Sequence, residues 1–201
     1  MSEEEKNTDS QKKLTDEYKS VIIGKQEWMV ENLNDNHFRN GNPILEAKSE
    51  EEWIKAGKEQ SPAWCYYDNE PENGEKYGKL YNWYAVNDPR GLAPEGWHIP
   101  SDDEWSQLID FCGEKSIADS LMESNSEWGN NNNENSFKAL PGGHRDFDGI
   151  CIGIDKNSNW WSSTENDINT AKRRFIFSYN YVFGGAYNKT YGFSVRCIKD
   201  K

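Results

Sequence analysis

The sequence predicts one α+β domain with long loops, and three observations lead to that prediction. Apolar segments typical of strands lie near both ends of the chain, at residues 21–30 and 191–199. A well-specified helix start lies between them, at Ser101. The chain is polar, but its 201 residues include 9 Trp, 10 Tyr and 8 Phe, enough large rings for the core of a loop-rich domain. We therefore expect the two end segments to pair in one sheet, with helices between them.

The length of the chain bounds its domain organisation. A chain of 201 residues accommodates one well-cored domain, and two compact domains would be crowded. We expect residues 1–20 to form a loosely ordered polar arm and residues 21–201 to form a single domain. The arm lacks the apolar segment of a secretory signal peptide, so we expect either a cytoplasmic protein or a trimmed chain.

The charge balance argues against some classes of partner. The formal net charge of −12 disfavours nucleic-acid backbones and anionic membranes, because both are themselves negatively charged. No apolar run approaches the length that crosses a bilayer, so no membrane insertion is expected.

The helix that begins at Ser101 is the most clearly specified element. Pro100 biases the residue before it toward an extended backbone. Ser101 and Glu104 have the spacing of a capping box, in which each side chain accepts a hydrogen bond from the other residue's backbone amide. Trp105 and Leu108 follow at helical spacing, so we expect this side of the helix to pack on the sheet.

Local patterns predict the other elements of the first half. A hairpin is expected at residues 21–30, a short helix after Ser49, and a buried strand at 63–67. The oxygen-rich loop at 68–75 lacks the spacing of a calcium-binding loop, so a solvated acidic turn is expected there. Residues 80–86 fit either a strand or a helix.

The second half is predicted to be mostly strands and loops. A helix is expected at 116–122 and an Asn-rich loop at 126–136. Arg145 follows a tight turn and is placed to hold neighbouring carbonyl groups. The expected strands are 150–154, 159–164, 172–179 and 191–199, with Gly184 and Gly185 in the connection between the last two.

Cysteine and histidine residues form no recognisable catalytic or metal-binding pattern. The four cysteines are widely separated and include no C-x-x-C pair: Cys65, Cys112, Cys151 and Cys197. We therefore expect buried free thiols rather than zinc ligands, with one or two disulfides as the alternative in an oxidising compartment. The three histidines are scattered and suggest no catalytic triad. We expect no catalytic residue, no cofactor and no metal.

The candidate binding residues lie near the C-terminus. Alternation along a strand places Arg173, Phe175, Phe177, Tyr179 and Tyr181 on one face. Two further rings follow, Phe183 and Tyr187. Rigid rings mixed with Gly, Ser and Asn are the composition of an antibody-like contact surface. The alternative for Phe175 and Phe177 is that they face the core.

Several motifs resemble those of the Fibrobacter succinogenes major paralogous domain. They occur in the same order and spacing: residues 23–33, 77–86, 96–105, 140–145, 160–165 and 191–200. The resemblance implies a C-type-lectin-like fold, with small mixed or antiparallel sheets, two main helices and long loops. It also implies a bacterial protein outside the cytoplasm. Calcium-dependent lectins carry Glu-Pro-Asn and Trp-Asn-Asp signatures that are not found at the matching places here, so calcium-dependent sugar binding is not expected.

The resemblance suggests three functional hypotheses. The first is a non-catalytic domain that binds a protein or a carbohydrate. A sharper form is the variable protein of a diversity-generating retroelement, because every residue from 173 to 188 can arise by rewriting the first two bases of an Asn codon. The second is an enzyme like the formylglycine-generating enzymes, but these need two neighbouring active-site cysteines. The third is a structural cell-surface module.

Overall fold

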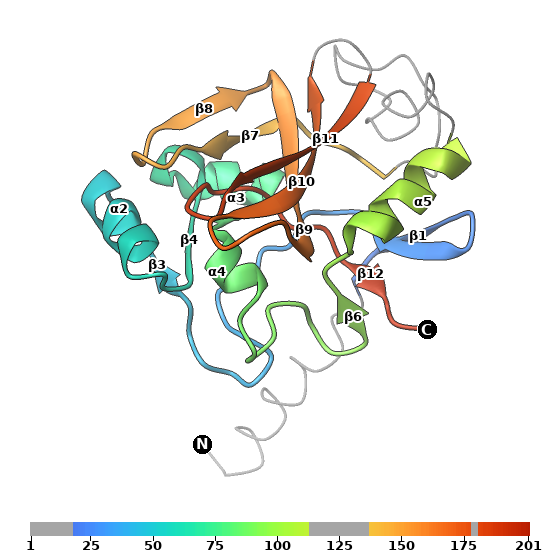
Figure 1. Ribbon diagram of the computed structural model, residues 1–201, viewed down its shortest axis with the longest axis horizontal. Coiled ribbons are helices and arrows are strands. Elements are labelled where there is room, and N and C mark those ends of the chain that lie inside the picture. Colours follow the sequence, from blue (N-terminus) through green and yellow to red (C-terminus); the bar gives the residue numbers. More distant parts are fainter. Residues whose placement is uncertain (1–17, 113–136, 178–180) are drawn as a thin grey trace, which may run out of the picture.

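The computed structural model describes residues 18–112, 137–177 and 181–201 and shows several small sheets with short helices (Figure 1). The predicted α+β class is confirmed. The helix predicted at 116–122, the Asn-rich loop and most of the N-terminal arm lie outside the described residues.

A four-stranded sheet joins the two ends of the chain. Strands β1 (Ser20–Ile23) and β2 (Gln26–Met29) form the predicted hairpin, and Gly24 turns between them with a φ of 62° that glycine adopts without steric cost. Strand β12 (Ile198–Lys199) pairs antiparallel with β2 and with β6 (Trp97–His98). The prediction that the two ends share one sheet is therefore confirmed.

Helix α5 (Asp102–Cys112) packs beside this sheet, as predicted. Its capping box is formed: Ser101 N donates to Glu104 Oε2 over 2.8 Å, and Glu104 N donates to Ser101 Oγ over 3.2 Å. The ring of Trp105 is 1% exposed, and its centroid lies 4.8 Å from that of Trp28 on β2. Such ring pairs contribute about 0.5–1.5 kcal/mol beyond the burial of their area.

A second, antiparallel sheet has the strand order β11-β10-β9. It consists of β9 (Asn157–Glu165), β10 (Thr170–Phe177) and β11 (Tyr181–Asn188). The prediction that Gly184 and Gly185 lie in a connection is wrong, because both lie within β11 and pair with β10. Neighbouring glycines usually mark a turn, but here the cross-strand pairing keeps them extended.

The strand predicted at 191–199 is much shorter in the structure. Only Ile198–Lys199 forms a ladder, whereas the residues before it make single bridges to three different elements: Gly192 to Arg145, Phe193 to Tyr81, and Ser194 to Trp160. A continuous ladder cannot form when the partner changes at every residue. The segment 192–197 instead runs buried through the middle of the domain.

The remaining elements surround this segment. In chain order they are β3 (Leu45–Glu46), α2 (Glu50–Lys58), β4 (Ala63–Cys65), the 3-10 helix η1 (Tyr67–Asn69), α3 (Pro71–Tyr77), β5 (Leu80–Tyr81), α4 (Trp83–Val86), β7 (Gly142–Arg145) and β8 (Cys151–Ile154). Strands β3, β4 and β5 form a three-stranded sheet, and β7 and β8 form a hairpin.

Two local predictions are refined by these elements. Residues 80–86 contain both alternatives, because strand β5 is followed by helix α4, whose first turn is capped by Asn82 Oδ1 accepting from Ala85 N over 3.1 Å. The turn predicted at 68–75 is largely helical. Pro71 begins helix α3, at a position where the missing N–H group has no helical partner to lose.

Buried arginines brace the core by donating to backbone carbonyl groups. Arg145 Nε donates to Gly149 O over 2.8 Å and Nη1 donates to Ala47 O over 3.0 Å, which confirms its predicted role. Arg196 is 1% exposed, and its acceptors are Asn32 Oδ1 and the carbonyl oxygens of Met29, Val30, Phe137 and Lys138.

Candidate ligand-binding site

The outer face of β10 and β11 carries several of the candidate binding residues. Phe175 lies opposite Phe183, and Phe177 lies opposite Tyr181. Directly opposed residues project from the same face of a sheet. The rings of Phe175 and Phe183 stack with centroids 5.2 Å apart. Phe177 and Phe183 are each 43% exposed and Phe175 is half-buried, so neither Phe175 nor Phe177 is part of the closed core.

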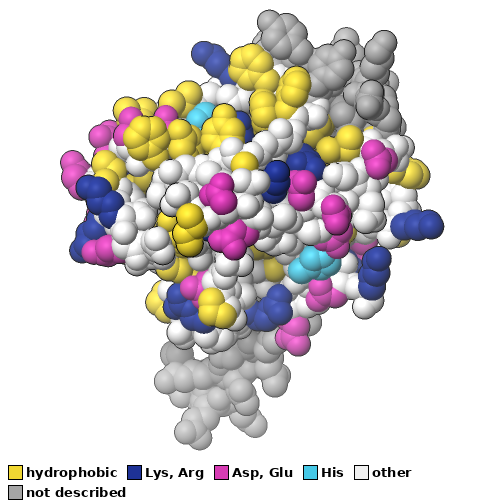
Figure 2. Space-filling view, viewed as in Figure 1, with side chains coloured by type: hydrophobic (Ala, Val, Ile, Leu, Met, Phe, Trp, Pro, Cys, Tyr) yellow, Lys and Arg dark blue, Asp and Glu magenta, His cyan; other side chains and the backbone are white. Residues whose placement is uncertain are grey.

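The same surface continues onto the β7–β8 hairpin. The ring centroids of Tyr187 and Tyr191 lie 5.5 Å apart, and those of Tyr191 and Phe147 lie 5.9 Å apart. We call this surface the aromatic face and define it as Phe147, Phe175, Phe177, Phe183, Tyr187 and Tyr191. Figure 2 shows hydrophobic side chains gathered along the upper part of the molecule, over β7–β8 and β10–β11.

The sequence did not predict that the β7–β8 hairpin contributes to this surface. Phe147 is 56% exposed, and Ile150 and Ile152 are 49% and 44% exposed. The alternation at 150–154 was a usable signal, since a half-buried strand leaves every second side chain outside. Nothing local, however, indicates that the hairpin joins the rings of β11, which it does through the contacts of Tyr191 with Phe147 and Tyr187.

Two of the candidate residues are described incompletely. Tyr179 lies outside the described residues, and Tyr181 is described only as the first residue of β11. Tyr187 is 37% exposed, so at least this tyrosine of the predicted set presents its ring to solvent.

Arg173 lies beneath the rings of the aromatic face rather than among the exposed groups. It is 6% exposed, and its Cζ atom lies 3.5 Å from the ring centroid of Tyr187 and 4.3 Å from that of Phe175. Its Nη1 atom donates to Asn159 Oδ1. Burial lowers the pKa of Arg173 to about 10, which still leaves the guanidinium charged at neutral pH.

Side chains on the inner face of β10 pack against helix α5 and the core. Arg174 forms an ion pair with Asp102 at the start of α5, and Nη2 of Arg174 donates to Ser106 Oγ over 3.0 Å. Ile176 is 1% exposed and belongs to the cluster around Trp105. Alternate residues of β10 therefore differ in role. Arg174 and Ile176 stabilise the core, whereas Phe175 and Phe177 contribute to the aromatic face.

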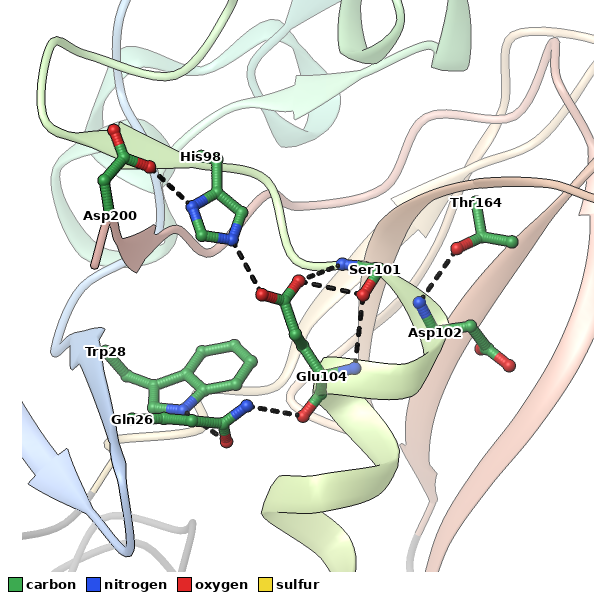
Figure 3. A network of polar contacts seen from close by, with 8 residues as sticks. All are labelled: Gln26, Trp28, His98, Ser101, Asp102, Glu104, Thr164 and Asp200. Atoms are coloured by element: carbon green, nitrogen blue, oxygen red, sulfur yellow. Dashed lines mark hydrogen bonds and ion pairs between the residues drawn. The ribbon is translucent and has the colours of Figure 1, made fainter.

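A polar network around His98 is the other conspicuous group of titratable residues (Figure 3). His98 Nδ1 lies 2.7 Å from Asp200 Oδ1, and Nε2 lies 2.9 Å from Glu104 Oε1. Burial lowers the pKa of His98, but hydrogen bonds to both carboxylates outweigh it, and the pKa is raised overall. The Ser101 hydroxyl donates to Glu104 over 2.8 Å and not to the imidazole, so this histidine does not activate a serine nucleophile.

The cysteines show no activation either. All four are free thiols, and burial raises the pKa of Cys65 to about 12 and also raises the pKa values of Cys112, Cys151 and Cys197. Among residues 18–112, 137–177 and 181–201, no group of three or more His, Cys, Asp and Glu side chains could hold a metal ion. In the same ranges, no helix has the length and apolar character that a membrane span requires.

Comparison with known protein families assigns the chain to one of them. The family model of the Fibrobacter succinogenes major domain matches residues 21–199. The chain is a member of this family. No curated protein and no solved structure matches it.

The motifs of the Fibrobacter succinogenes major domain in this chain map onto the interior. Trp28, Tyr81, Trp83 and Trp161 are each 3% exposed or less, and Ser101 caps helix α5. These residues hold the fold, whereas most of the aromatic face lies outside the motifs. Membership of the family therefore accounts for the scaffold and does not indicate a function for the aromatic face.

Proposed function

We propose that this member of the family is a non-catalytic recognition domain that contacts its ligand through the aromatic face. The observation that carries the proposal is a surface of exposed and half-buried rings, in which Arg173 links Phe175 to Tyr187, on a scaffold held by other residues. Large rings supply contact area with few rotatable bonds, so ordering them on binding costs little entropy. Exposed apolar patches of this kind commonly mark interaction sites on soluble proteins.

The chemistry of the other polar groups supports the non-catalytic part of the proposal. His98 is held between two carboxylates, and its nearest hydroxyl donates elsewhere. The raised pKa values of the cysteines keep them as thiols, which are poor nucleophiles. We also propose a C-type-lectin-like fold, which is supported by the pairing of both chain ends in one sheet and by the long loops between the short elements.

The binding experiment compares two matched double variants. Peptide-phage and glycan-array screens with the wild-type domain identify binders, which are then measured against Phe183→Ser/Tyr187→Ser and against Ile22→Ser/Leu45→Ser. The second pair is also exposed, at 74% and 50%, but lies on β1 and β3. We expect at least tenfold weaker binding for the first pair and unchanged binding for the second. Binders that lose affinity equally for both pairs would refute the proposal.

A sharper form of the proposal is that the segment 173–188 varies between copies, as in a diversity-generating retroelement. The strand register then predicts which positions vary. Outward residues such as Phe175, Phe177 and Phe183 are free to change, whereas Arg174 and Ile176 are tied to the core. A near-copy of the coding DNA, differing only at adenines and adjacent to a reverse transcriptase gene, would support this. Its absence from the genome would leave a domain with a fixed surface.

A further inference from the structure

Strand β11 forms an open edge of the second sheet. The strand order is β11-β10-β9, so β11 has a neighbouring strand on one side only. The far side of β9 is covered by the buried segment 192–197, because Trp161 N donates to Ser194 O and Ser194 N donates to Asn159 O. The remaining strands at sheet edges in the described chain have two to four residues, whereas β11 has eight.

The hydrogen-bonding pattern shows which residues of β11 present unpaired backbone groups. Lys189 N donates to Asn169 O over 3.0 Å, so the pair that extends the β10–β11 ladder is a hydrogen-bonded one. In an antiparallel ladder, hydrogen-bonded pairs alternate with pairs whose backbone groups point to the outer sides. Odd-numbered residues of β11 therefore bond to β10, and Val182, Gly184 and Ala186 turn their N–H and C=O groups outward. These outward groups have no backbone or side-chain partner among the described residues.

Strand β11 lacks the features that keep an edge strand from pairing. Proteins commonly protect an edge with a charged side chain, a proline or a β-bulge. The sequence of β11, YVFGGAYN, contains no charged residue and no proline, and its eight residues pair with β10 without a bulge. Gly184 and Ala186 are exposed. A long, regular and uncharged edge of this kind can accept an additional strand.

We infer that the edge of β11 pairs with β11 of a second copy of this chain, antiparallel and around a two-fold axis. The register that uses the outward groups places Gly184 opposite Gly184 of the second copy, and Val182 opposite Ala186 of the second copy. Each outward N–H group then meets an outward C=O group, and none is left unpaired. The two three-stranded sheets form one continuous sheet. The inference goes beyond the proposed function and does not depend on it.

The side chains of β11 favour a second copy over an unrelated peptide. In this register Phe183 lies opposite Gly185 of the second copy, in a pair without mutual hydrogen bonds, where side chains approach most closely. A Cβ atom added at Gly185 would meet nothing within 4 Å, so the position is open to the ring of Phe183, which is 43% exposed. Because the interface is two-fold symmetric, this contact forms twice. Aromatic rings stabilise sheets when they cover a glycine on the neighbouring strand.

The charge of the chain predicts a weak association that salt strengthens. The formal net charge of −12 makes two copies repel each other, although β11 itself brings no charged side chain into the interface. Salt screens this repulsion, so the dimer should become tighter as the salt concentration rises. A basic peptide at the same edge would show the opposite dependence. One strand from each copy gives an interface at the small end of the protein range, so the dimer should be reversible.

Such a dimer presents two aromatic faces on the same side of one sheet. Directly opposed residues project from the same face, so Phe183 and Tyr187 of both copies point in the same direction. A ligand with two matching sites would bind to both copies at once, which raises its overall affinity without any new contact.

The association is measured on the full chain by sedimentation velocity, at about 20 µM to 1 mM protein, because a small interface gives a weak dimer. We expect a reversible monomer–dimer equilibrium that is at least threefold tighter at about 0.5 M than at about 0.05 M NaCl. Hydrogen exchange of the Val182, Gly184 and Ala186 amides should become at least twofold slower as the protein is concentrated. The amides of Phe183 and Gly185 should change less, because they already bond to β10.

A sample that mixes isotope-labelled and unlabelled protein tests the register. It should show an intermolecular NOE between the ring of Phe183 and the Hα atoms of Gly185, because these residues are opposite each other in the proposed pairing. An intermolecular NOE pattern that places β11 against any other element would overturn the pairing.

Two variants, each with a matched control, test the edge itself. Ala186→Pro removes an outward N–H group that β10 does not use, and edge strands tolerate proline at such positions, so this variant should fold and dimerise at least tenfold more weakly. Ala186→Ser keeps the N–H group and should dimerise as wild type does. Gly185→Glu places a charge opposite Phe183 of the second copy and should also weaken the dimer at least tenfold. Ile22→Glu adds the same charge to strand β1, where Ile22 is 74% exposed, and should leave the dimer unchanged.

Thermal unfolding shows whether each variant is folded, and Gly185→Glu decides the question if Ala186→Pro is not. A chain that stays monomeric at about 1 mM protein and about 0.5 M NaCl would overturn the inference. A dimer that persists in the folded variants would show that another surface associates, and would overturn the role of β11. A phage-selected peptide that protects the Val182, Gly184 and Ala186 amides of a monomeric chain would overturn the second copy as the occupant. The phage and glycan screens decide the proposed function independently.

Discussion

Replacing His98 with glutamine should destabilise the domain at pH 5.5 and have a smaller effect at pH 8.5. The pKa of His98 is raised above 6.5, because its hydrogen bonds to Glu104 and Asp200 together outweigh the opposing effect of burial. A raised pKa contributes stability that is fully present below the unfolded value of about 6.5 and is lost as the pH rises through the folded value.

Glu104 sets the lower limit of the same window. Burial raises the pKa of Glu104, but hydrogen bonds from Ser101 and His98 outweigh burial, and the pKa is lowered below 4.5. A lowered pKa contributes stability that is present above the unfolded value and is lost as the pH falls through the folded value. The network should therefore contribute most between about pH 4.5 and pH 6.5.

The expected magnitude is modest because the network is partly exposed. The side chains of His98 and Asp200 are 38% and 50% exposed, so water screens the charges and the loss should be about 1 kcal/mol at pH 5.5. For a domain of this size that corresponds to a Tm lower by roughly 2–4 °C.

The assay is thermal unfolding of wild type and His98→Gln across pH 4 to pH 9. His37→Gln is the control, because His37 is exposed and hydrogen-bonded to Asn36 rather than held between carboxylates. Asp200→Asn should reproduce part of the loss. A difference in Tm between wild type and His98→Gln that stays constant across the whole range would refute the reasoning.

Three further predictions concern the scaffold. Trp105→Ala should lower the free energy of unfolding by about 3–5 kcal/mol, because the ring is 1% exposed; a near-wild-type urea midpoint would contradict this. Gly143→Ala should cost roughly 1–3 kcal/mol, since its φ is 66° and the added Cβ would lie 2.6 Å from a backbone carbonyl, whereas Gly185→Ala should change stability by less than about 0.5 kcal/mol in the same assay. Cys65 and Cys197 are 0% exposed and should react with a thiol reagent only after unfolding; fast reaction of the native protein would show that the core opens locally.

The sequence predicts those parts of the fold that depend on interactions between residues close together in the chain. The capping box at Ser101 depends on two residues three positions apart, and it forms as expected. The outward position of Phe177 and the inward position of Ile176 follow from alternation within one strand. In each case the interaction that decides the structure is local.

The parts that the sequence does not predict depend on distant segments. Arg173 is buried because Tyr187 and Phe193 approach it from other parts of the chain. Alternation along the strand predicts the face on which Arg173 lies, but it does not predict that Arg173 is buried. The strand expected at 191–199 is interrupted because its partners belong to three separate elements. Phe147 joins the aromatic face only through Tyr191, a contact that no pattern around Phe147 indicates.

Because β1 and β12 belong to one sheet, an attachment near either strand holds the domain from the same side. Chain connections leave from Ser20 and Lys199, which belong to one sheet, and Figure 1 places this sheet across the molecule from the β7–β8 hairpin. Immobilising the protein through either end should therefore give the same affinity for a binder of the aromatic face, whereas a linker at Asp148, between β7 and β8, should block it. Attachment at Ser20 or Lys199 should therefore leave the β7–β8 side of the molecule accessible.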